Sequence, residues 1–427
     1  MSTVGIIAEY NPFHTGHAYQ IAEARKRTGA DHVLVIMSGD FVQRGAPAIM
    51  DKYFRTRLAL EGGADYVLEL PVWMAAASAA DFAEGGVSIL DALNCVDYLC
   101  FGSEAGELPR LKEAAALFLE EPPAFQDVLR QQLSAGKSFP KARKIAWEAV
   151  TQTSGDFLDL PNNILGISYL MALEKRHSTI QPVTIPRQGS FHNQELNGSF
   201  ASASALRKQL LKHTCIVEDT CTLEHPCTGT SPESFPARIL PYLSSESAGQ
   251  WMKQEYGRSY PMDTSHFWSV LKTQLLSKAE YAEEFADMPK ELANRLKSCY
   301  FSCNSYEELA ESLKTAAFTR SRIDRCLLHI LLDIRQSDVN WFKENGTAFY
   351  ARLLGFRKSH AELLKELTTK RQIPVLTKAL PPENLSAPAA ASYTLDTKAA
   401  NLYESIRGIS YPAKKPIHEY RKKLIVV

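Results

Sequence analysis

The segment that most constrains the fold of this chain is an apolar run that breaks at an Asn-Pro turn and continues into two histidines. Residues 5–17 read GIIAEYNPFHTGH, and an amphipathic stretch follows with Ile21 and Arg25 at helical spacing. A strand, a tight turn and a helix start, in this order, form the place where α/β proteins bind phosphate, because backbone N–H groups and the positive helix end point at the anion. His14 and His17 can both reach one phosphate chain. We therefore expect chemistry at the α–β phosphate bond of a nucleotide.

Short apolar runs alternate with helical patterns through the first two hundred residues. The expected strands are 4–8, 32–37, 66–70, 98–101 and 180–185, and the expected helices are 15–27, 51–61, 80–93 and 163–176. Strands separated by helices predict a parallel sheet with right-handed crossovers, and such sheets bind ligands at the carboxyl ends of their strands. The turn with His14 and His17 falls at that edge. The predicted fold class is α/β with a Rossmann-like parallel sheet.

The rest of the chain is more helical. Residues 106–152 read as a helical insertion before the last strand, and residues 216–240, rich in Thr, Ser, Pro and Cys, read as a linker or loop. From about 262 to 370 the pattern is helical almost throughout. We therefore expect an α/β domain over 1–215 and a mainly helical region over 241–427 that ends in a basic segment.

The composition narrows the class of protein further. Lys+Arg and Asp+Glu are both 48 in 427 residues, so any RNA partner would need local basic patches. No signal peptide and no apolar run of about 20 residues is visible, which predicts a cytoplasmic protein without a membrane partner. The eight cysteines are scattered, as is typical of reduced thiols. A zinc site stays open as the less favoured alternative because the five-residue gaps are not CxxC spacing, and its residues would be His213, Cys215, Cys221, His225 and Cys227.

The His-x-Gly-His pattern is weak alone, and its position between a strand and a helix strengthens it. In the functional interpretation the imidazoles donate to phosphate oxygens and stabilise charge at the phosphorus, while Gly16 lets the backbone approach the triphosphate. In the structural alternative, His14 and His17 only cap the helix or form hydrogen bonds within the turn.

A second candidate phosphate site begins another basic helical stretch. Residues 202–207 read SASALR, with small hydroxyl residues before a helix N-terminus and Arg207 one turn in. The alternative is a serine N-cap with a solvated arginine, which is common.

Together, these two elements resemble the HxGH and Ser-Ser-Thr-x-Ile-Arg motifs of the nucleotidyltransferase superfamily, relatives of class I aminoacyl-tRNA synthetases. Those enzymes attack the α-phosphate of ATP and release pyrophosphate. In this chain Ala203 and Ser204 replace a serine and a threonine of the second motif. The resemblance therefore implies that His14, His17 and Arg207 are catalytic, while the hydroxyl contacts are less well matched.

A longer match points to one family within the superfamily. Its segments are GIIAEYNPFHTGH (5–17), MSGDFVQRG (37–45), GADYVLELP (63–71), FGSE (101–104) and PNNILG (161–166), with continuations at 318–332 and 350–356. Together they resemble the bacterial tRNA(Met) cytidine acetate ligase family. The resemblance implies a nucleotidyltransferase domain over 1–215 and a tRNA-binding region over 241–427. The implied reaction is ATP-dependent N4-acetylation of the wobble cytidine of elongator tRNA(Met) through acetyladenylate. We also expect Mg²⁺, which would offset the repulsion between the two negative reactants.

The same resemblance implies the residues that contact ATP. They are Ile7, Ala8, Glu9, Tyr10, Asn11, Pro12, Phe13, His14, Thr15, Gly16, His17, Ala18, Tyr19, Gln20, Gly102, Asn162, Asn163 and Arg187. Physically, Gly102 allows close approach of the adenosine, an asparagine amide offers hydrogen bonds, and Arg187 can pair with phosphate. Taken alone, Gly102 would be read as a turn glycine, the asparagine as a helix N-cap and Arg187 as a surface arginine.

Two further groups of residues are weaker candidates. Asp40, Arg44 and Lys52, in and after the loop that follows the second strand, could position acetate or phosphate, and an Asp40–Arg44 surface ion pair is an equal alternative. For tRNA phosphates the candidates are the basic residues Arg320, Arg322, Arg325, Lys414 and Lys415. The alternative for these is a solvated helix face balanced by acidic neighbours.

Two rival functions remain. One is an adenylyltransferase for a small cofactor precursor, which would not need over two hundred extra residues. The other is a non-catalytic RNA-binding protein with a nucleotide fold, in which the intact motif would be unexpected.

Overall fold

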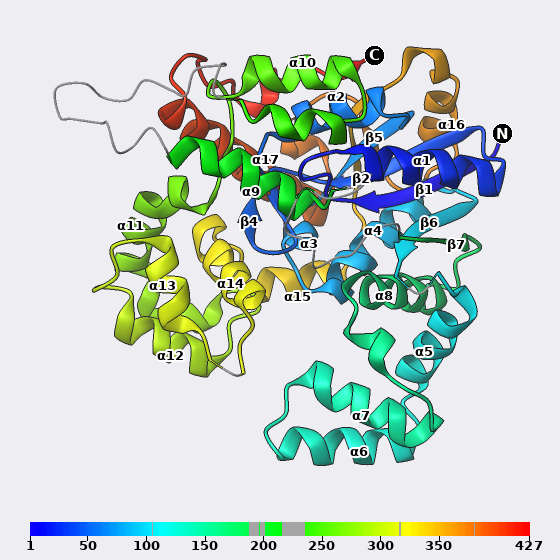
Figure 1. Cartoon of the computed structure of the whole chain (residues 1–427), viewed down its shortest axis with the longest axis vertical. Coiled ribbons are helices and arrows are strands. Elements are labelled where there is room, and N and C mark those ends of the chain that lie inside the picture. The colour runs from blue at the N-terminus through cyan, green and yellow to red at the C-terminus, as the bar shows by residue number, and fades with distance from the viewer. Residues whose placement is uncertain (105, 188–195, 197–200, 216–234, 316, 380) are drawn as a thin grey trace.

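An eight-stranded sheet forms the centre of the molecule (Figure 1). The computed structural model describes residues 1–104, 106–187, 196, 201–215, 235–315, 317–379 and 381–427. The sheet runs in the order β10-β8-β5-β2-β1-β6-β7, with β9 paired to β8. Its strands are β1 (Thr3–Ala8), β2 (His32–Ser38), β5 (Tyr66–Leu70), β6 (Tyr98–Ser103), β7 (Gln181–Pro186), β8 (Ala351–Phe356), β9 (Val375–Leu376) and β10 (Ile425–Val426). A small antiparallel pair, β3 (Phe41–Val42) and β4 (Ala46–Pro47), follows β2.

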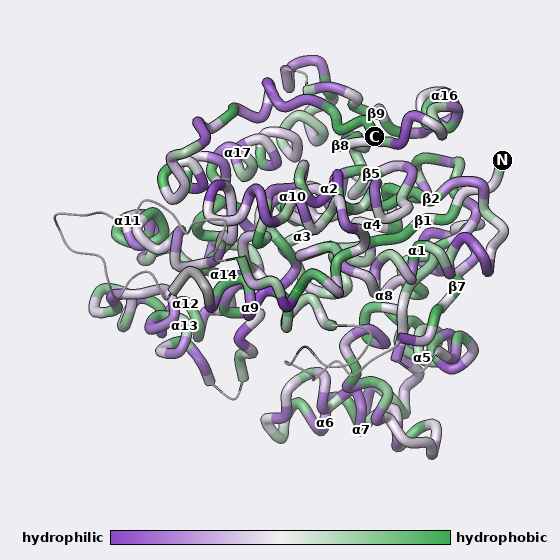
Figure 2. The backbone as a smooth tube through the Cα atoms, turned by 45° about the horizontal axis from the view of Figure 1, so that its top comes forward, coloured by the Kyte–Doolittle hydropathy of each residue, from purple (hydrophilic) through white to green (hydrophobic). Residues whose placement is uncertain are grey.

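All five predicted strands are present, and they pair in parallel from β5 to β7. Alternate residues of β1 and β2 face opposite sides, as the pleat of a strand requires. Val4 and Val33 pack with helices α1 (Thr15–Thr28) and α2 (Lys52–Glu61), whereas Ile7 and Ile36 pack with α4 (Ala79–Leu93) and α8 (Pro161–Lys175). The predicted α/β class is therefore confirmed. Figure 2 shows β1 and β2 as largely hydrophobic segments in the interior.

The segment over 106–152 that the sequence predicts as an insertion is helical. It consists of α5 (Leu108–Glu120), α6 (Pro123–Ser134) and α7 (Phe139–Thr151), and α6 and α7 lie at the lower end of the view in Figure 1. A short 3-10 helix, η1 (Asp156–Asp159), leads from α7 into α8. Two more helices complete this part of the chain: α3 (Val72–Ala75) and α9 (Ala203–Cys215).

The second half of the chain is mainly helical, as predicted. Its α-helices are α10 (Glu246–Glu255), α11 (Trp268–Lys278), α12 (Lys290–Cys299), α13 (Tyr306–Leu313), α14 (Arg320–Leu332), α15 (Gln336–Glu344), α16 (Leu363–Thr369) and α17 (Ala387–Ser410). Its 3-10 helices are η4 (Ala237–Tyr242), η5 (Thr264–Phe267), η6 (Ala279–Glu284), η7 (Lys358–His360), η8 (Pro382–Asn384) and η9 (Glu419–Arg421). In the part of the chain that the structure describes, no helix is long and apolar enough to cross a membrane.

The sheet differs from the prediction at one edge. The prediction assigned 262–370 almost entirely to helix, but β8 lies in this range and pairs antiparallel with β5. Strand β10, near residue 425, then pairs parallel with β8. A division at residue 240 therefore does not separate two independent units, because the second region contributes strands to the sheet of the first.

The loop after β2 also contacts the helical region. Gly45 has φ of 79°, and a Cβ on it would lie 2.2 Å from the backbone nitrogen of Arg325 in α14. Only glycine allows this approach without displacing the backbone of either segment. The carboxyl edge of the sheet, where ligands are expected, therefore packs against α14.

Candidate active site

The turn between β1 and α1 places two imidazoles face to face. The rings of His14 and His17 stack with centroids 3.8 Å apart and an interplanar angle of 29°. His14 is the N-cap of α1, and its Nδ1 accepts a hydrogen bond from the Gly16 N–H at 3.0 Å. The Nδ1 of His17 accepts from the His14 N–H at 3.3 Å. Because a backbone N–H can only donate, both neutral rings carry their proton on Nε2, which is the atom available to an anion.

The environment keeps both imidazoles uncharged. Burial, together with the nearby cations Arg187 and Arg207, lowers the pKa of His14 to about 3. Burial, His14 and Arg187 together hold the pKa of His17 well below its ordinary value. At neutral pH both imidazoles are therefore uncharged, and the positive charges beside them belong to arginines. The capping role proposed as the structural alternative is real, and it orients the donors.

Arg207 joins the second motif to the first. It lies on α9, yet its Nη1 donates to the carbonyl of Asn11 at 2.6 Å and its Nη2 donates to Ser204 Oγ at 3.0 Å. Ser202 Oγ accepts from the Ala205 N–H at 3.1 Å and so caps the helix. Burial lowers the pKa of Arg207, an effect that Glu9 opposes. The two predicted motifs, nearly two hundred residues apart in sequence, therefore form one site.

Strands β6 and β7 supply the opposite side of the site. The Arg187 N–H donates to the carbonyl of Ser103 at 2.9 Å. A Cβ on Gly102 would lie 3.4 Å from the Arg187 side chain, so these two residues lie side by side in the wall of the site. Asn162 Nδ2 donates to Glu104 Oε1 at 2.5 Å, which fixes its amide at the start of α8.

These elements enclose a cavity of about 330 Å³ at the carboxyl ends of β1, β6 and β7. From the predicted ATP contacts, its lining includes Ile7, Ala8, Glu9, Tyr10, Asn11, His14, Gly16, His17, Tyr19, Gln20, Gly102, Asn162 and Arg187. Arg44 and Arg207 also line it. The volume suits a nucleotide-sized ligand.

Other residues predicted to contact ATP do not line the cavity. Phe13 is buried and packs edge-on against Tyr10, with centroids 4.8 Å apart. Asn163 is also buried, and its Oδ1 accepts from the Glu104 N–H while its Nδ2 donates to the Phe157 carbonyl, both at 3.0 Å. Its role in the structure is to hold the turn after β6. The remaining predicted residues outside the lining are Pro12, Thr15 and Ala18.

Lys52 and Asp40 lie in a buried polar cluster outside the cavity. The Lys52 ammonium is 2.6 Å from Glu69 Oε1 and 2.7 Å from Glu419 Oε1. Asp40 Oδ1 accepts from the Lys52 N–H at 2.7 Å, and burial raises the pKa of Asp40 to about 7. Neither an acetate contact of Lys52 nor a surface position of Asp40 fits these contacts. The sequence did not predict this, because short-range patterns do not show which charges the fold buries.

The sequence interpretation missed one buried arginine that builds the site. Arg55 of α2 is fully buried and donates to the carbonyls of Glu9 at 2.6 Å and Ser38 at 3.1 Å, and also to that of Gly39. It thereby ties the ends of β1 and β2 together. Its sequence context, an arginine within an ordinary helical pattern, carries no signal of this role.

An apolar wall of the cavity was missed as well. It is formed by Ala79, Phe82, Phe101, Leu165 and Tyr169. These positions read in sequence as core residues of helices and a strand, and only the fold shows that they face a ligand space.

The arginines predicted to bind tRNA are engaged with carboxylates. Arg320 pairs with Glu307 at 2.5 Å and Asp324 at 2.9 Å. Arg322 and Arg325 both pair with Asp287, at 3.2 Å and 2.7 Å. Near the C-terminal end, Lys414 pairs with Glu255, and Lys415 is exposed. The acidic neighbours considered in the alternative interpretation are therefore present for most of these residues. Of the possible zinc ligands, Cys221, His225 and Cys227 lie outside the described residues, as do the side chains of His213 and Cys215.

The fold and this site define a nucleotidyltransferase of the HIGH type. The profile of the HIGH Nucleotidyl Transferase family matches residues 1–415. A tRNA(Met) cytidine acetate ligase from Acetivibrio thermocellus is 38% identical over 383 residues, which cover 88% of each chain. One from Clostridium perfringens is 33% identical and covers 94% of this chain and 95% of the relative. The structure of Thermotoga maritima TmcAL bound with alpha-thio ATP matches all of both chains with a TM-score of 0.85 and 29% identity. The chain belongs to the tRNA(Met) cytidine acetate ligase family.

Proposed function

We propose that this protein activates acetate with ATP and transfers the acetyl group to N4 of the wobble cytidine of elongator tRNA(Met). The observation that carries the proposal is the single cavity that brings together the His14–His17 turn, Arg187 and Arg207. Support also comes from relatives that are named for this activity and that match the chain over most of their length.

In the first step, an acetate oxygen attacks the α-phosphorus of ATP, and the bond to the bridging oxygen breaks so that pyrophosphate leaves. Acetate is already an anionic nucleophile, so the step needs no general base. The protein must instead offset the repulsion between two negative reactants. Arg187 and Arg207 supply positive charge, and the Nε2–H groups of His14 and His17 donate to phosphate oxygens.

Mg²⁺ belongs to this proposal as the partner of the triphosphate. Among the described residues that line the cavity, Glu9 is the only carboxylate, and its Oε1 accepts from the Gln43 N–H at 2.9 Å. Mg²⁺ usually binds through one or two carboxylates together with substrate phosphates and waters, so Glu9 fits this requirement. The ion would supply further charge neutralisation.

In the second step, the exocyclic amine of the cytidine attacks the acetyl carbonyl carbon. The bond to the adenylate oxygen breaks, AMP leaves, and N4 loses one proton. The apolar wall formed by Ala79, Phe82, Phe101, Leu165 and Tyr169 would exclude water from the mixed anhydride. A base in the anticodon loop is already unpaired and can enter such a space at small cost.

The role of Arg320, Arg322, Arg325, Lys414 and Lys415 in holding tRNA stays a prediction. Binding through them would require phosphates to replace the carboxylates that now contact most of them. The affinity for tRNA should then fall as salt rises, and a salt-independent affinity would contradict a phosphate-binding role. The proposed tRNA substrate implies that the enzyme works in the cytoplasm.

One assay tests the overall reaction. The protein is incubated with ATP, radiolabelled acetate and total tRNA, and the tRNA is digested to nucleosides. We expect label in N4-acetylcytidine. ATP consumption without labelled tRNA would favour a small-molecule adenylyltransferase, and no turnover would favour an RNA-binding protein.

A second assay isolates the first step. Acetate-dependent exchange of pyrophosphate into ATP needs no tRNA, so it reports acetyladenylate formation alone. The double variant His14→Ala/His17→Ala should lose the exchange. The exposed Lys212, on the same helix as Arg207, provides a charge-removing control, Lys212→Ala, that should keep it. Equal exchange in the histidine variant would refute the assigned role.

A further inference from the structure

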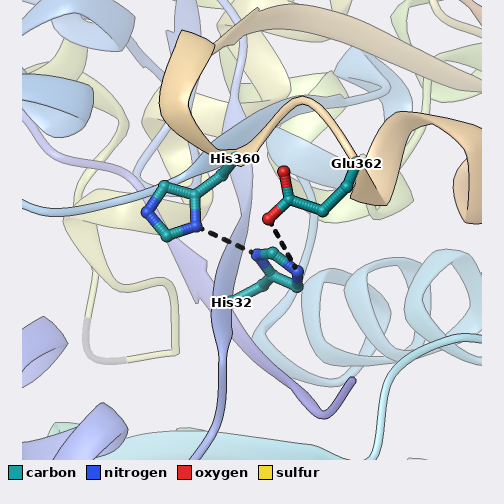
Figure 3. A group of neighbouring side chains, drawn as sticks. All are labelled: His32, His360 and Glu362. Carbon is teal, nitrogen blue, oxygen red and sulfur yellow. Dashed lines mark hydrogen bonds and ion pairs between the residues drawn. The ribbon is translucent and has the colours of Figure 1, made fainter.

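Two histidines and a glutamate meet at the end of the sheet opposite to the cavity (Figure 3). His32 is the first residue of β2, His360 ends η7, and Glu362 follows two residues later. One nitrogen of each imidazole and one oxygen of Glu362 lie within 4.8 Å of one another. The cavity lies at the other end of β2, so this cluster stands about 20 Å from it along the strand.

The spacing of the two imidazoles suits a metal ion. His32 Nδ1 and His360 Nδ1 are 3.2 Å apart. Two ligands on tetrahedral Zn²⁺, with bonds of about 2.0–2.1 Å, are about 3.3 Å apart. The other nitrogen of His360, Nε2, lies 3.3 Å from Asp65 Oδ1, the kind of carboxylate contact that orients a metal-bound histidine.

The hydrogen bond between the two Nδ1 atoms leaves other polar atoms of this cluster without a partner among the described residues. The His32 side chain is 2% exposed, and its Nε2 has no hydrogen-bond partner among the described residues. Oδ1 of the fully buried Asp65 has no hydrogen bond within the described part of the chain either, although it lies 3.3 Å from His360 Nε2. Buried polar atoms are nearly always paired, so the unpaired nitrogen of His32 is a second sign that a ligand belongs there. A cation on the two Nδ1 atoms would polarise the His360 Nε2–H toward Asp65.

Of the two carboxylates beside the imidazoles, one is already paired with arginines and the other can bind an ion. Asp65 is shared with Arg25, 2.5 Å from Oδ2, and with Arg357, 3.7 Å from Oδ1. Glu362 Oε1 lies 3.8 Å from His32 Nε2, and the Glu362 side chain is 45% exposed, so it can turn toward the imidazoles without disturbing the core. Glu362 is therefore the carboxylate available as a third ligand, and Asp65 is available as an outer carboxylate.

We propose that His32, His360 and Glu362 form a structural Zn²⁺ site. Two imidazoles and one carboxylate are a donor set that zinc accepts, whereas Mg²⁺ and Ca²⁺ prefer oxygen ligands throughout. The site joins the start of β2 to the turn after β8, so the ion would hold the edge of the sheet that the second half of the chain supplies. Because it lies far from the cavity, it has no part in the reaction.

Metal binding to the full-length, metal-stripped protein tests the proposal. Zn²⁺ is titrated by calorimetry, and thermal unfolding is followed with and without Zn²⁺ or Mg²⁺. We expect one Zn²⁺ at this site, a higher Tm with Zn²⁺ and no change with Mg²⁺. His360→Ala and Glu362→Gln should each weaken binding by at least about tenfold and remove the Tm shift. The control is Glu366→Gln, a nearby helical residue outside the cluster that pairs with Lys370.

All measurements use a Cys221→Ser/Cys227→Ser background, which removes the cysteine ligands that the sequence leaves open. X-ray absorption of the zinc-loaded protein should show only N/O ligands at about 2.0–2.1 Å, and sulfur at about 2.3 Å would overturn the assignment. Equal zinc affinity and Tm shift in Glu362→Gln and in the control would also overturn it, as would the absence of binding in the parent. Glu362 is partly exposed, so this variant remains informative if His360→Ala fails to fold.

Discussion

Replacing Lys52 with methionine should destabilise the protein without removing a substrate contact. The Lys52 ammonium lies between Glu69 and Glu419, and the three side chains are 1%, 5% and 3% exposed. Removing one partner of a buried ion pair costs about 3–5 kcal/mol because an uncompensated charge remains. Arg352 still lies 3.8 Å from Glu69 and 3.0 Å from Glu419, which places the expected loss near the lower limit, about 3 kcal/mol.

Urea unfolding of the wild type, Lys52→Met, Glu419→Gln and the double variant measures this effect. Glu419→Gln removes the negative charge that Lys52→Met leaves unbalanced. The double variant should therefore lose less free energy of unfolding than the two single variants together, by about 0.5–3 kcal/mol. At a temperature where Lys52→Met is folded, acetate-dependent pyrophosphate exchange should remain. The reasoning is refuted if Lys52→Met unfolds within about 1 kcal/mol of the wild type and yet loses acetate-dependent exchange, because Lys52 would then contact the substrate.

Three more outcomes follow from the site. The imidazole signals of His14 and His17 should be those of neutral Nε2–H tautomers that do not titrate between pH 5 and 8, and nuclear magnetic resonance midpoints near 6.5 for both would contradict this. Arg207→Ala should lower kcat/KM for pyrophosphate exchange by about 10²–10³, as the loss of a preorganised donor does, while Lys212→Ala stays within about twofold; equal rates would exclude the role of Arg207. Burial alone would raise the pKa of Glu419, but Lys52 and Arg352 outweigh it and lower this pKa to about 2. The folded state therefore binds this proton less tightly than the unfolded state, and the stability from Glu419 is present above about pH 4.5 and lost as the pH falls toward 2. When the urea midpoint is plotted against pH, it should fall less steeply at acid pH for Glu419→Gln than for the wild type. An unchanged slope would argue against this contribution.

The parallel part of the sheet was predictable because each strand is a short apolar run bounded by turn residues. The site was partly predictable for the same reason, since the carboxyl ends of parallel strands bring the His14–His17 turn and Arg187 to one edge. Arg207 was predictable from its motif. These are properties of local sequence.

The remainder depends on contacts between distant segments. Strand β8 is a short apolar run within a helical region, and such a run is ambiguous until its pairing with β5 decides it. The positions of Lys52 and Arg55 are equally non-local. Both lie on α2. Lys52 is held by carboxylates from β5 and from near residue 419, and Arg55 is held by carbonyls just after β1 and at the end of β2.

The pairing of β8 and β10 with β5 has a consequence for how the chain can be divided. All five residues of β5 are buried, and β8 covers its outer edge only when residues 351–356 are present. A fragment that stops near residue 240 would leave that edge as an open row of backbone donors and acceptors on a hydrophobic strand, which is a template for aggregation. During synthesis, about 280 residues (71–350) separate the end of β5 at residue 70 from the start of β8 at residue 351, so this edge stays unpaired until they have been made. Folding of the nucleotide-binding half is therefore completed late, by the half that follows it.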